Sequence, residues 1–403
     1  MTFGSTTSGS IPSRCRDGRF AVRRLLLGAA LVCACLGLTS CGGSGETRSA
    51  PAQDFAALAR ATTTSAPQLA DGVLVRVEGS AVGALAVDST HIVWESGPIQ
   101  SDDFQPSVYE RDLETHRVRV LAKDADPLYG LASTAGWVFY ARRTPAGIEL
   151  RQVGHGAAGG DRAVTTSLLG LVASRGNVVA WAEQDGKRQT IVALDSTSGR
   201  RYIVARVPAC TDRGCYRIGQ IAIAEEGIVF TRDAIEGQPS VLVRWTFATQ
   251  ATRSFIVPND PQPDVVATPH GVLYYALLRG WFQLTFTGDR PTAFTPPRKP
   301  AGAILVGRRG QRVYLLVRRG CNSEMHWAAA SGRPNAHTLL QPRVLRILAG
   351  ASEGACVQLA GITWAGRQPL TSWSLAPEED VAGHSDDGLR GVIVAGSPSP
   401  ERP

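Results

Sequence analysis

From about Gly72 onwards, apolar residues occur mainly in short runs that glycine, proline, aspartate and arginine separate. Hardly any stretch keeps apolar positions at a helical spacing for three turns, whereas short apolar runs bounded by turn residues are typical of strands. Several runs, such as Val178–Trp181, are continuously apolar. Such runs indicate strands that are covered on both faces. The pattern therefore predicts an all-β domain.

One unit recurs seven times in this part of the chain. In its first copy, Gly83–Val87 leads through a polar turn to His91–Trp94, and a second hairpin follows around Tyr109 and Val118. Two hairpins give four strands per unit. The second strands repeat at spacings of 41 to 50 residues when the following positions are taken as equivalent: Val93, Val138, Val179, Val229, Leu273, Tyr314 and Val357.

The turns of the second hairpins share one chemistry. Asp112 and Asp195 stand where a carboxylate can accept backbone N–H groups of the turn. Gly199 stands where the backbone needs a positive φ, and His116 and Gln250 are poorer substitutes at the matching places. The turn residues support the assignment of the hairpins independently of the apolar runs.

Four-stranded units of this length resemble the blades of β-propellers, of the kind seen in WD-repeat and Tol-pathway proteins. The resemblance rests on period and hairpin pattern, since the Gly-His and Trp-Asp signatures of WD repeats are absent. It implies a single β-propeller over residues 72–384 with seven blades, six or eight being the alternatives; a run of separate β-sandwiches is the other interpretation. Gly72–Val77 precedes the first complete unit, and we expect it to complete the last blade. Residues 385–403 are expected to form a mostly disordered tail.

The first forty residues have the character of a targeting segment. Five arginines precede the uncharged run Leu25–Leu38, which is too short for the roughly 20 apolar residues of a membrane-spanning helix. Leu38–Gly42 then resembles the lipobox of bacterial lipoproteins, with an aliphatic residue and two small residues before Cys41. An ordinary secretory signal is the alternative. The pair Arg23–Arg24 leaves the twin-arginine export route open as well.

The lipobox resemblance implies a signal peptide over residues 1–40, a lipid on Cys41, a flexible tether over 41–71 and a domain held at the extracytoplasmic side of the cell membrane. Removal of the leader also changes the charge. The chain has 42 basic and 35 acidic residues, of which five and one lie in the leader, so that 37 and 34 remain. This small excess, together with export, argues against a nucleic-acid partner.

Four cysteines besides Cys41 remain in the exported chain, and an oxidising compartment favours disulfides. Cys210 and Cys215 enclose four residues, so a local loop is the simplest pairing, which leaves Cys321 with Cys356. The second pairing stays open, because the repeat alignment allows these two cysteines to lie at opposite ends of neighbouring blades. None of the four forms a CxxC pair, which argues against a zinc or thioredoxin-like site.

No motif identifies a reaction. The seven histidines show no metal-ligand spacing, so neither a metal nor another cofactor is expected and catalytic residues stay unknown. Gly154–Gly159 matches GxGxxG, but a strand pattern follows it instead of a helix, which predicts a hairpin turn within the second unit.

Loops that join blades share one side of a propeller with loops that join second to third strands, and such loops often carry binding. We therefore expect the domain to bind a protein, peptide or cell-envelope ligand through this loop face. A propeller-type lyase or hydrolase acting on a sugar or peptide is the alternative. The candidate binding residues on this rim are Asp102, Asp103, Asp212, Arg213, Tyr216, Asp233, Arg318 and Arg319.

Overall fold

The computed structural model describes the strand-rich part of the chain, all of it within the unit Thr47–Pro403. The described residues are 57, 59, 69, 72–97, 106–208, 216–234, 239–257, 265–276, 280–294, 304–309, 312–319, 322–329, 338–339, 356–366, 368–376 and 389–396. Their regular structure is almost entirely β-strand, with short 3-10 turns η1 (Pro127–Tyr129) and η2 (His155–Ala157). Among these residues no helix is long and apolar enough to cross a bilayer.

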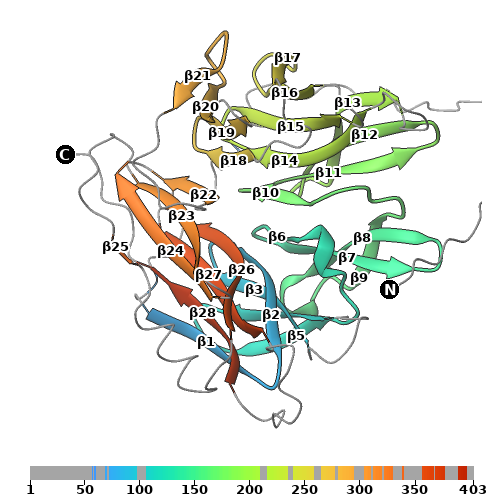
Figure 1. Cartoon of the computed structure of the whole chain (residues 1–403). Helices are drawn as coiled ribbons and strands as arrows, with labels where there is room; N and C mark the ends of the chain where they lie inside the picture. Colours follow the sequence, from blue (N-terminus) through green and yellow to red (C-terminus); the bar gives the residue numbers. More distant parts are fainter. Residues whose placement is uncertain are drawn as a thin grey trace, which may run out of the picture. The chain divides into compact units, whose positions relative to one another are not determined.

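The first three sheets follow one another along the chain, each with four antiparallel strands (Figure 1). Sheet 1 contains β2 (Ala81–Val87), β3 (His91–Gly97), β4 (Ser107–Asp112) and β5 (Val118–Ala122). Sheet 2 contains β6 (Leu131–Ser133), β7 (Trp137–Thr144), β8 (Gly147–Gly154) and β9 (Asp161–Thr165). Sheet 3 contains β10 (Ala173–Arg175), β11 (Val178–Asp185), β12 (Arg188–Asp195) and β13 (Arg200–Pro208).

The next three sheets repeat the same order of strands. Sheet 4 contains β14 (Tyr216–Ile223), β15 (Gly227–Ala234), β16 (Ser240–Thr246) and β17 (Thr252–Val257). Sheet 5 contains β18 (Val265–Thr268), β19 (Gly271–Ala276), β20 (Gly280–Thr285) and β21 (Thr292–Phe294). Sheet 6 contains β22 (Ile304–Arg309), β23 (Arg312–Arg319), β24 (Asn322–Ala329) and β25 (Thr338–Leu339).

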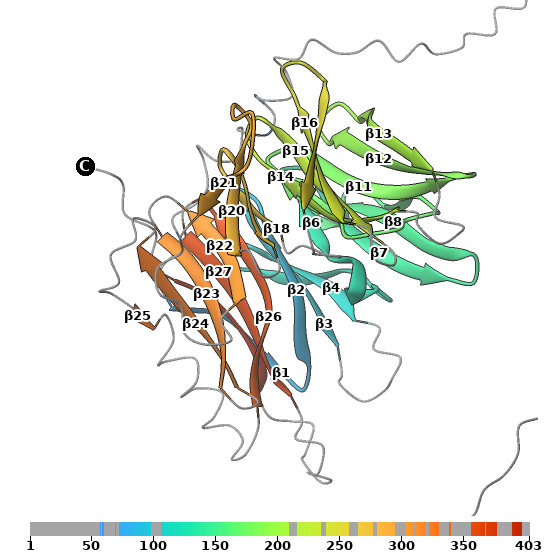
Figure 2. The same cartoon turned by 45° about the horizontal axis from the view of Figure 1, so that its top comes forward.

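Sheet 7 joins the two ends of the domain. It contains β26 (Cys356–Ala365), β27 (Gln368–Ala376) and β28 (Leu389–Ala395), followed by β1 (Gly72–Glu78) as its outermost strand. In Figure 1 and Figure 2 the blue β1 lies beside the red strands of this sheet. The expectation that the N-terminal strand completes the last sheet is confirmed by the antiparallel pairing of β1 with β28. The side-chain amide of Gln368 adds two hydrogen bonds to the backbone of Leu69, of 2.8 and 2.9 Å.

Apolar side chains hold neighbouring sheets together, and each contact between neighbours has its own hydrophobic cluster. One cluster lies between sheets 1 and 2, and others follow in order around to the pair formed by sheets 6 and 7. A further cluster, which includes Ile92 and Ile393, joins sheet 7 back to sheet 1. The packing is therefore circular, as in a β-propeller, and middle strands such as β11 are covered on both faces.

The first strand of every sheet lines one central channel. The cavity has a volume of about 360 Å³, and its lining residues include Leu85, Leu131, Ala173, Ile221, Val265, Val306 and Ile362, one from each of the seven first strands. Because the first strands converge on the channel, strands as short as β6 and β10 are long enough to contribute to its wall.

The predicted turn chemistry is confirmed. The Asp112 carboxylate accepts the backbone N–H groups of Glu114 and Thr115 at 2.9 and 2.7 Å, and Asp195 accepts that of Thr197 at 2.9 Å. Gly199 has a φ of +71°, and the two residues expected to replace glycine at this place, His116 and Gln250, have φ values of +60° and +51°.

Two expectations for the end of the domain are wrong. Leu389–Ala395 lies within the stretch expected to be a disordered tail, but it forms β28, and Val392 and Ile393 are fully buried. Val357, expected in a second strand, lies in β26, the first strand of sheet 7. The apolar period locates each repeat unit but does not separate first from second strands, because both are buried in this fold. The shift by one strand left β28 unassigned.

Candidate functional site

The most concentrated group of ionisable side chains lies between sheets 1 and 2. We call Asp88, Glu110 and His155 the ionic cluster. Asp88 follows β2, Glu110 lies in β4, and His155 begins η2 in the turn between β8 and β9. The two carboxylates are fully buried, and the exposed fraction of the His155 side chain is 9%. The cluster therefore places two carboxylates of sheet 1 against one imidazole of sheet 2.

His155 bridges the two carboxylates. Its Nε2 lies 3.0 Å from Asp88 Oδ2 and its Nδ1 lies 2.8 Å from Glu110 Oε2. Nε2 is also 2.8 Å from the backbone oxygen of Thr134. The turn that carries His155 is the glycine-rich segment predicted as a hairpin turn, and Gly156, with a φ of +72°, donates its backbone N–H to Glu110 at 2.7 Å. The glycine allows the turn to fold down onto the neighbouring sheet.

The remaining carboxylate oxygens are also satisfied. Asp88 Oδ2 accepts the hydroxyl of Ser133 at 2.5 Å, and its Oδ1 accepts the backbone N–H groups of Thr90 at 2.7 Å and His91 at 3.0 Å. Glu110 Oε1 accepts Nε of Arg119 as well. Because each charged oxygen has a donor, the cluster avoids the large cost of an unpaired buried charge.

These contacts favour the charged form of all three groups. Burial alone would lower the pKa of His155, but its hydrogen bonds with Asp88 and Glu110 outweigh burial and raise the pKa to about 9. Burial would raise the pKa of Asp88, yet hydrogen bonds from His155 and His91 hold it far below its usual range. The pKa of Glu110 is lowered in the same way by His155 and Arg119. At neutral pH the cluster is an imidazolium between two carboxylates.

Acid–base catalysis requires a group that can exchange a proton with a substrate. His155, Asp88 and Glu110 are buried and hydrogen-bonded to one another instead. Ser133 donates to Asp88, and in the described contacts no hydrogen bond joins it to His155, as a nucleophile relay would need. The cluster is therefore best described as an electrostatic contact that fastens sheet 2 to sheet 1.

Asp88, His91 and His155 lie close enough to be candidate metal ligands, since one atom from each lies within 4.8 Å of the others. The rings of His91 and His155 are stacked, with centroids 4.0 Å apart and planes 3° from parallel. A zinc ion binds in the plane of each imidazole at about 2.0 to 2.1 Å. Nitrogen lone pairs in two parallel, separated planes cannot both point at one ion. The arrangement does not fit a metal unless a ring turns.

A third acid in the same interface, Glu95 in β3, has no such partners. Its side chain is completely buried; the backbone N–H of Ala84 acts on the carboxylate, but neither oxygen has a side-chain partner within the described structure. Gly83 in β2 lies directly against it, since a Cβ on this glycine would be in van der Waals contact with Glu95 Oε2 at 3.4 Å. Burial raises the pKa of Glu95 to about 7, and the nearby charge of Asp126 adds to the rise.

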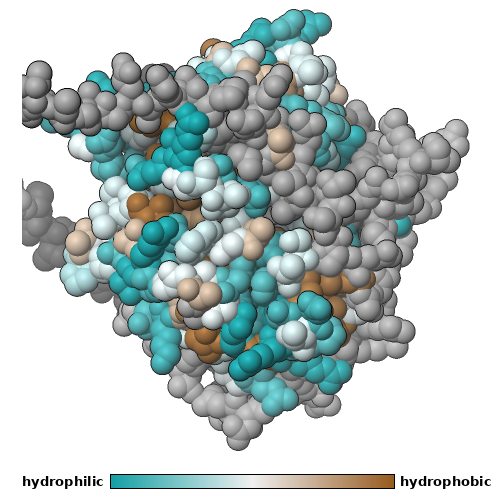
Figure 3. All heavy atoms as spheres, turned by 180° about the vertical axis from the view of Figure 1, so that it is seen from behind, coloured by the Kyte–Doolittle hydropathy of each residue, from teal (hydrophilic) through white to brown (hydrophobic). Residues whose placement is uncertain are grey.

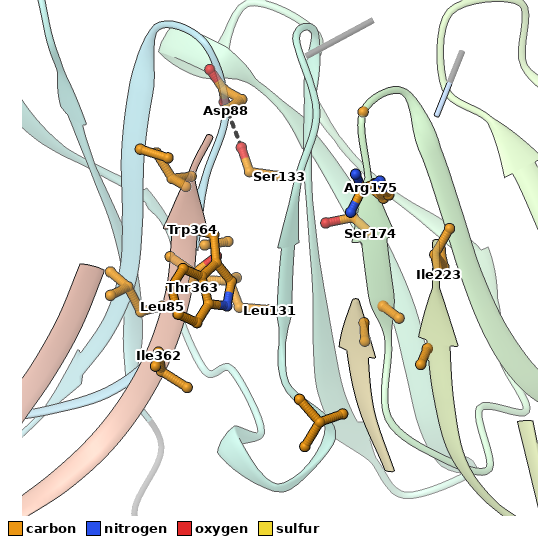
Figure 4. Close-up of a pocket in the computed structure, with 18 of the residues that line it drawn as sticks. Leu85, Asp88, Leu131, Ser133, Ser174, Arg175, Ile223, Ile362, Thr363 and Trp364 are labelled. Atoms are coloured by element: carbon orange, nitrogen blue, oxygen red, sulfur yellow. Dashed lines mark hydrogen bonds between the residues drawn. The ribbon is translucent and has the colours of Figure 1, made fainter. Parts of the chain in front are cut away.

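The central channel presents polar groups at one mouth. Figure 4 shows Asp88 and Ser133 on one side of the channel, Ser174 and Arg175 on another, and aliphatic side chains such as Leu131 deeper in the wall. Arg175 is paired with Glu225 of the neighbouring sheet at 2.7 Å. The turns between first and second strands are thus tied to each other across sheets at this mouth, as Asp88 and Ser133 are.

The connections between sheets carry exposed leucines. Leu128 in η1, between sheets 1 and 2, is 70% exposed, and Leu169 and Leu171, between sheets 2 and 3, are 37% and 44% exposed. The two connections lie side by side, because the backbone N–H of Val172 donates to the oxygen of Tyr129 at 3.0 Å. We call Leu128, Leu169 and Leu171 the leucine patch. On the face shown in Figure 3, hydrophobic residues likewise reach the surface in separate areas among hydrophilic ones.

Most of the predicted rim residues are not placed by the structure. Asp102, Asp103, Asp212 and Arg213 lie outside the described residues, as do Cys41, Cys210, Cys215 and Cys321. Tyr216, Arg318, Arg319 and Cys356 lie in strands, but their side chains fall outside the described part. The expected disulfides and the roles of these residues stay predictions.

Asp233 is the one rim residue whose side chain is described, and its assignment to an exposed rim is wrong. It is 3% exposed and lies against Gly219, where a Cβ would come within 2.0 Å of its Oδ2. Gly219 and Asp233 repeat in sheet 4 the arrangement of Gly83 and Glu95 in sheet 1: a first-strand glycine lies against a second-strand acid.

The ionic cluster was missed by sequence reasoning, because its members are up to 67 positions apart and belong to different sheets. One local signal was available. His155 is the only ionisable residue within the glycine-rich turn Gly154–Gly159, and a bulky polar residue between glycines in a tight turn needs a polar partner nearby.

Comparisons with known proteins agree with the fold and do not identify a family. No family model matches the sequence, and no curated protein does. Among solved structures, one from a study of two prolyl endopeptidases overlaps 79% of this chain and 47% of its own at 13% identity, with a TM-score of 0.52. The β-propeller domain of the Trilobed protease from Pyrococcus furiosus has 6% identity and a TM-score of 0.48, over 74% of this chain and 90% of its own. BamB from Moraxella catarrhalis has 13% identity and a TM-score of 0.46, over 83% and 94%. At such identities the likeness concerns the fold alone.

Proposed function

We propose that this chain is an extracytoplasmic lipoprotein, anchored through a lipid on Cys41, whose β-propeller binds a protein or peptide of the cell envelope through its loop face. The leucine patch is the observation that carries the binding part of the proposal. Its leucines sit on the connections between sheets, which is the side where binding was expected, and exposed apolar side chains that lie together often mark a contact surface.

The scaffold beneath the patch supports the same proposal. Both connections start and end in strands of sheets 1 to 3, and the backbone hydrogen bond from Val172 to Tyr129 fixes them to each other. A surface that is already ordered loses less conformational entropy on binding than a mobile one. The anchoring part of the proposal rests on the lipobox resemblance at Leu38–Gly42.

An enzymatic function is less well supported. Acids and a histidine do come together from two sheets, as a propeller-type lyase or hydrolase would require, but they are ionised, buried and saturated with partners in the ionic cluster. Glu95 has a pKa suited to proton transfer but is completely buried and does not line the channel. The groups of the ionic cluster and Glu95 are therefore not accessible to a substrate in the described structure.

The test replaces the leucines by serine. A Leu128→Ser, Leu171→Ser variant and wild type are used to capture detergent-solubilised envelope components under identical conditions. Val118→Ser, Val120→Ser is the matched control, because these valines in β5 are 49% and 45% exposed but lie in an outer strand of sheet 1. We expect the leucine variant to lose at least about tenfold of a specifically captured component, which corresponds to roughly 1.4 kcal/mol, while the valine variant behaves as wild type. Equal capture by all three proteins would contradict the proposal.

A further inference from the structure

Glu95 is the buried acid for which the fold offers no counter-charge. It lies in β3 opposite Val108 of β4, and Gly83 and Ala84 of β2 cover it from the inside of the sheet. None of these neighbours carries a charge. Both carboxylate oxygens are inaccessible to solvent and lack side-chain hydrogen-bond partners among the described residues, so that the backbone N–H of Ala84 is the polar group that acts on them.

The surroundings of Glu95 favour a bound proton, and therefore the neutral carboxyl, over a metal ion or a paired cation. The described residues contain one group of three or more potential metal ligands, and Glu95 is not part of it. Arg143 of β7, the cation that pairs with the neighbouring Asp126 at 2.9 Å, is 61% exposed. A neutral carboxyl in an apolar interior costs far less than an ionised one. Near neutral pH the protonated and the ionised forms of Glu95 are therefore both populated.

Asp126 connects Glu95 to the loop face. It immediately precedes η1, and its charge is the one that acts on Glu95. Asp126 Oδ1 accepts the backbone N–H of Leu128 at 3.2 Å, which caps η1. Its backbone N–H donates to the oxygen of Ala141 at 2.8 Å, which holds the connection onto sheet 2. Whatever displaces Asp126 also displaces Leu128.

We propose that Glu95 and Asp126 form a proton-sensitive contact that sets the position of η1 and thereby the availability of the leucine patch. With Glu95 protonated, one negative charge lies in this region and Arg143 balances it. With Glu95 ionised, a second, uncompensated charge is buried beside it. The conformations that relieve this cost move Asp126 and η1 away from sheet 1 and let water reach Glu95.

The link to binding rests on the proposed function, whereas the movement of η1 does not. We expect η1 to be ordered below pH 7 and loosened above it, because the ionised fraction of Glu95 rises about tenfold between pH 6 and pH 8. The ionic cluster at the other end of the interface keeps its charges over this interval, except for a small loss of the proton on His155. Sheets 1 and 2 thus stay joined there while the loop-face end responds.

Hydrogen–deuterium exchange of the full exported chain tests the movement. Exchange is measured at pH 6 and pH 8, corrected for intrinsic rates, in peptides covering residues 123–131. Wild type is expected to lose protection about tenfold at pH 8, and Glu95→Gln to stay protected at both values. Glu183→Gln is the matched control, because Glu183 lies in the second strand of sheet 3 and is paired with Arg201; it should behave as wild type.

Two results would overturn the proposal: no pH dependence in wild type, or the same pH dependence in Glu95→Gln. Should Glu95→Gln fail to fold, Asp126→Asn gives the second measurement, since removing the other charge is expected to reduce the pH effect at least threefold, and an unchanged effect overturns the proposal as well. Capture of the envelope component at pH 6 and pH 8 then separates the two proposals. A pH effect on exchange with no effect of Leu128→Ser on capture supports the contact and contradicts the proposed binding function.

Discussion

His155 of sheet 2 lies 2.8 Å from the carboxylate of Glu110 in sheet 1, with both side chains withdrawn from solvent. The neighbouring apolar cluster of these sheets, which includes Val93 and Val138, would by itself allow sliding, since apolar contacts are not directional. Charged hydrogen bonds between fixed positions are directional. The hydrophobic residues therefore stabilise the contact between the two sheets, and the ion pair fixes the position of one sheet relative to the other.

Replacing His155 by glutamine should destabilise the domain strongly. Asp88 and Glu110 would remain buried without the cation between them, and breaking a buried ion pair from one side costs about 3 to 5 kcal/mol. Chemical denaturation followed by tryptophan fluorescence measures the loss. His270→Gln is the control, because His270 pairs with Glu226 at 2.9 Å but is 69% exposed; its effect should stay within about 1 kcal/mol. Similar losses in both variants would contradict the role given to His155.

The contribution of the ionic cluster should depend on pH in a defined direction. The pKa of His155 is raised to about 9, so its stabilising effect is complete below its unfolded pKa of roughly 6.5 and is lost as the pH rises through 9. The pKa values of Asp88 and Glu110 are lowered, so their effect is complete above about 4.5 and is lost as the pH falls. The cluster is most stabilising between these limits.

The measurement for this pH dependence is the difference in unfolding free energy between wild type and His155→Gln. It should shrink by about 3 kcal/mol between pH 6 and pH 10. Using the difference removes the contribution of Glu95, which both proteins share. A difference that stays constant over this interval would show that the proton on His155 plays no part.

Truncation should distinguish the expected tail from the observed strand. A chain ending at residue 384 lacks β28, which lies between β27 and β1 in sheet 7. Sheet 7 would then be split and the contact between both ends of the domain lost, so we expect an unfolded or aggregated product. A chain ending at Gly396 keeps β28 and the hydrogen bond from Gly396 to Pro369, of 2.9 Å. It should retain the thermal midpoint of the full chain within about 4 °C. Equal solubility of both products would contradict the role of β28.

Lipid attachment at Cys41 predicts that a single substitution changes how the protein is processed and anchored. Cys41→Ser removes the thiol that would carry the lipid, and the protein should remain unprocessed at this position or be released without lipid. Partitioning into the detergent phase and the mass of the mature N-terminus measure this. Cys33→Ser, a cysteine within the apolar run of the leader, serves as the control and should partition as wild type. Detergent partitioning of Cys41→Ser equal to that of wild type would contradict lipid attachment at Cys41.

The sequence by itself determined the repeated architecture. Apolar runs, their period and the turn residues at Asp112, Asp195 and Gly199 predict four-stranded units, and the structure confirms them. The unpaired strand at Gly72 also predicted how the domain closes. These features depend on local preferences and on alternation within a few residues, which a single sequence displays directly.

Only the tertiary structure decided which side chains meet between sheets. Asp88 and His155 come together because sheets 1 and 2 pack at one particular offset, and Glu95 is buried in the same interface with Gly83 of the adjacent strand against it. The same dependence on packing hid β28, since Val392 and Ile393 are buried against sheets 6 and 1, which cover the two faces of sheet 7. Strand spacing alone carries no information on the offset between sheets, because twist and side-chain packing set it for the whole circle at once.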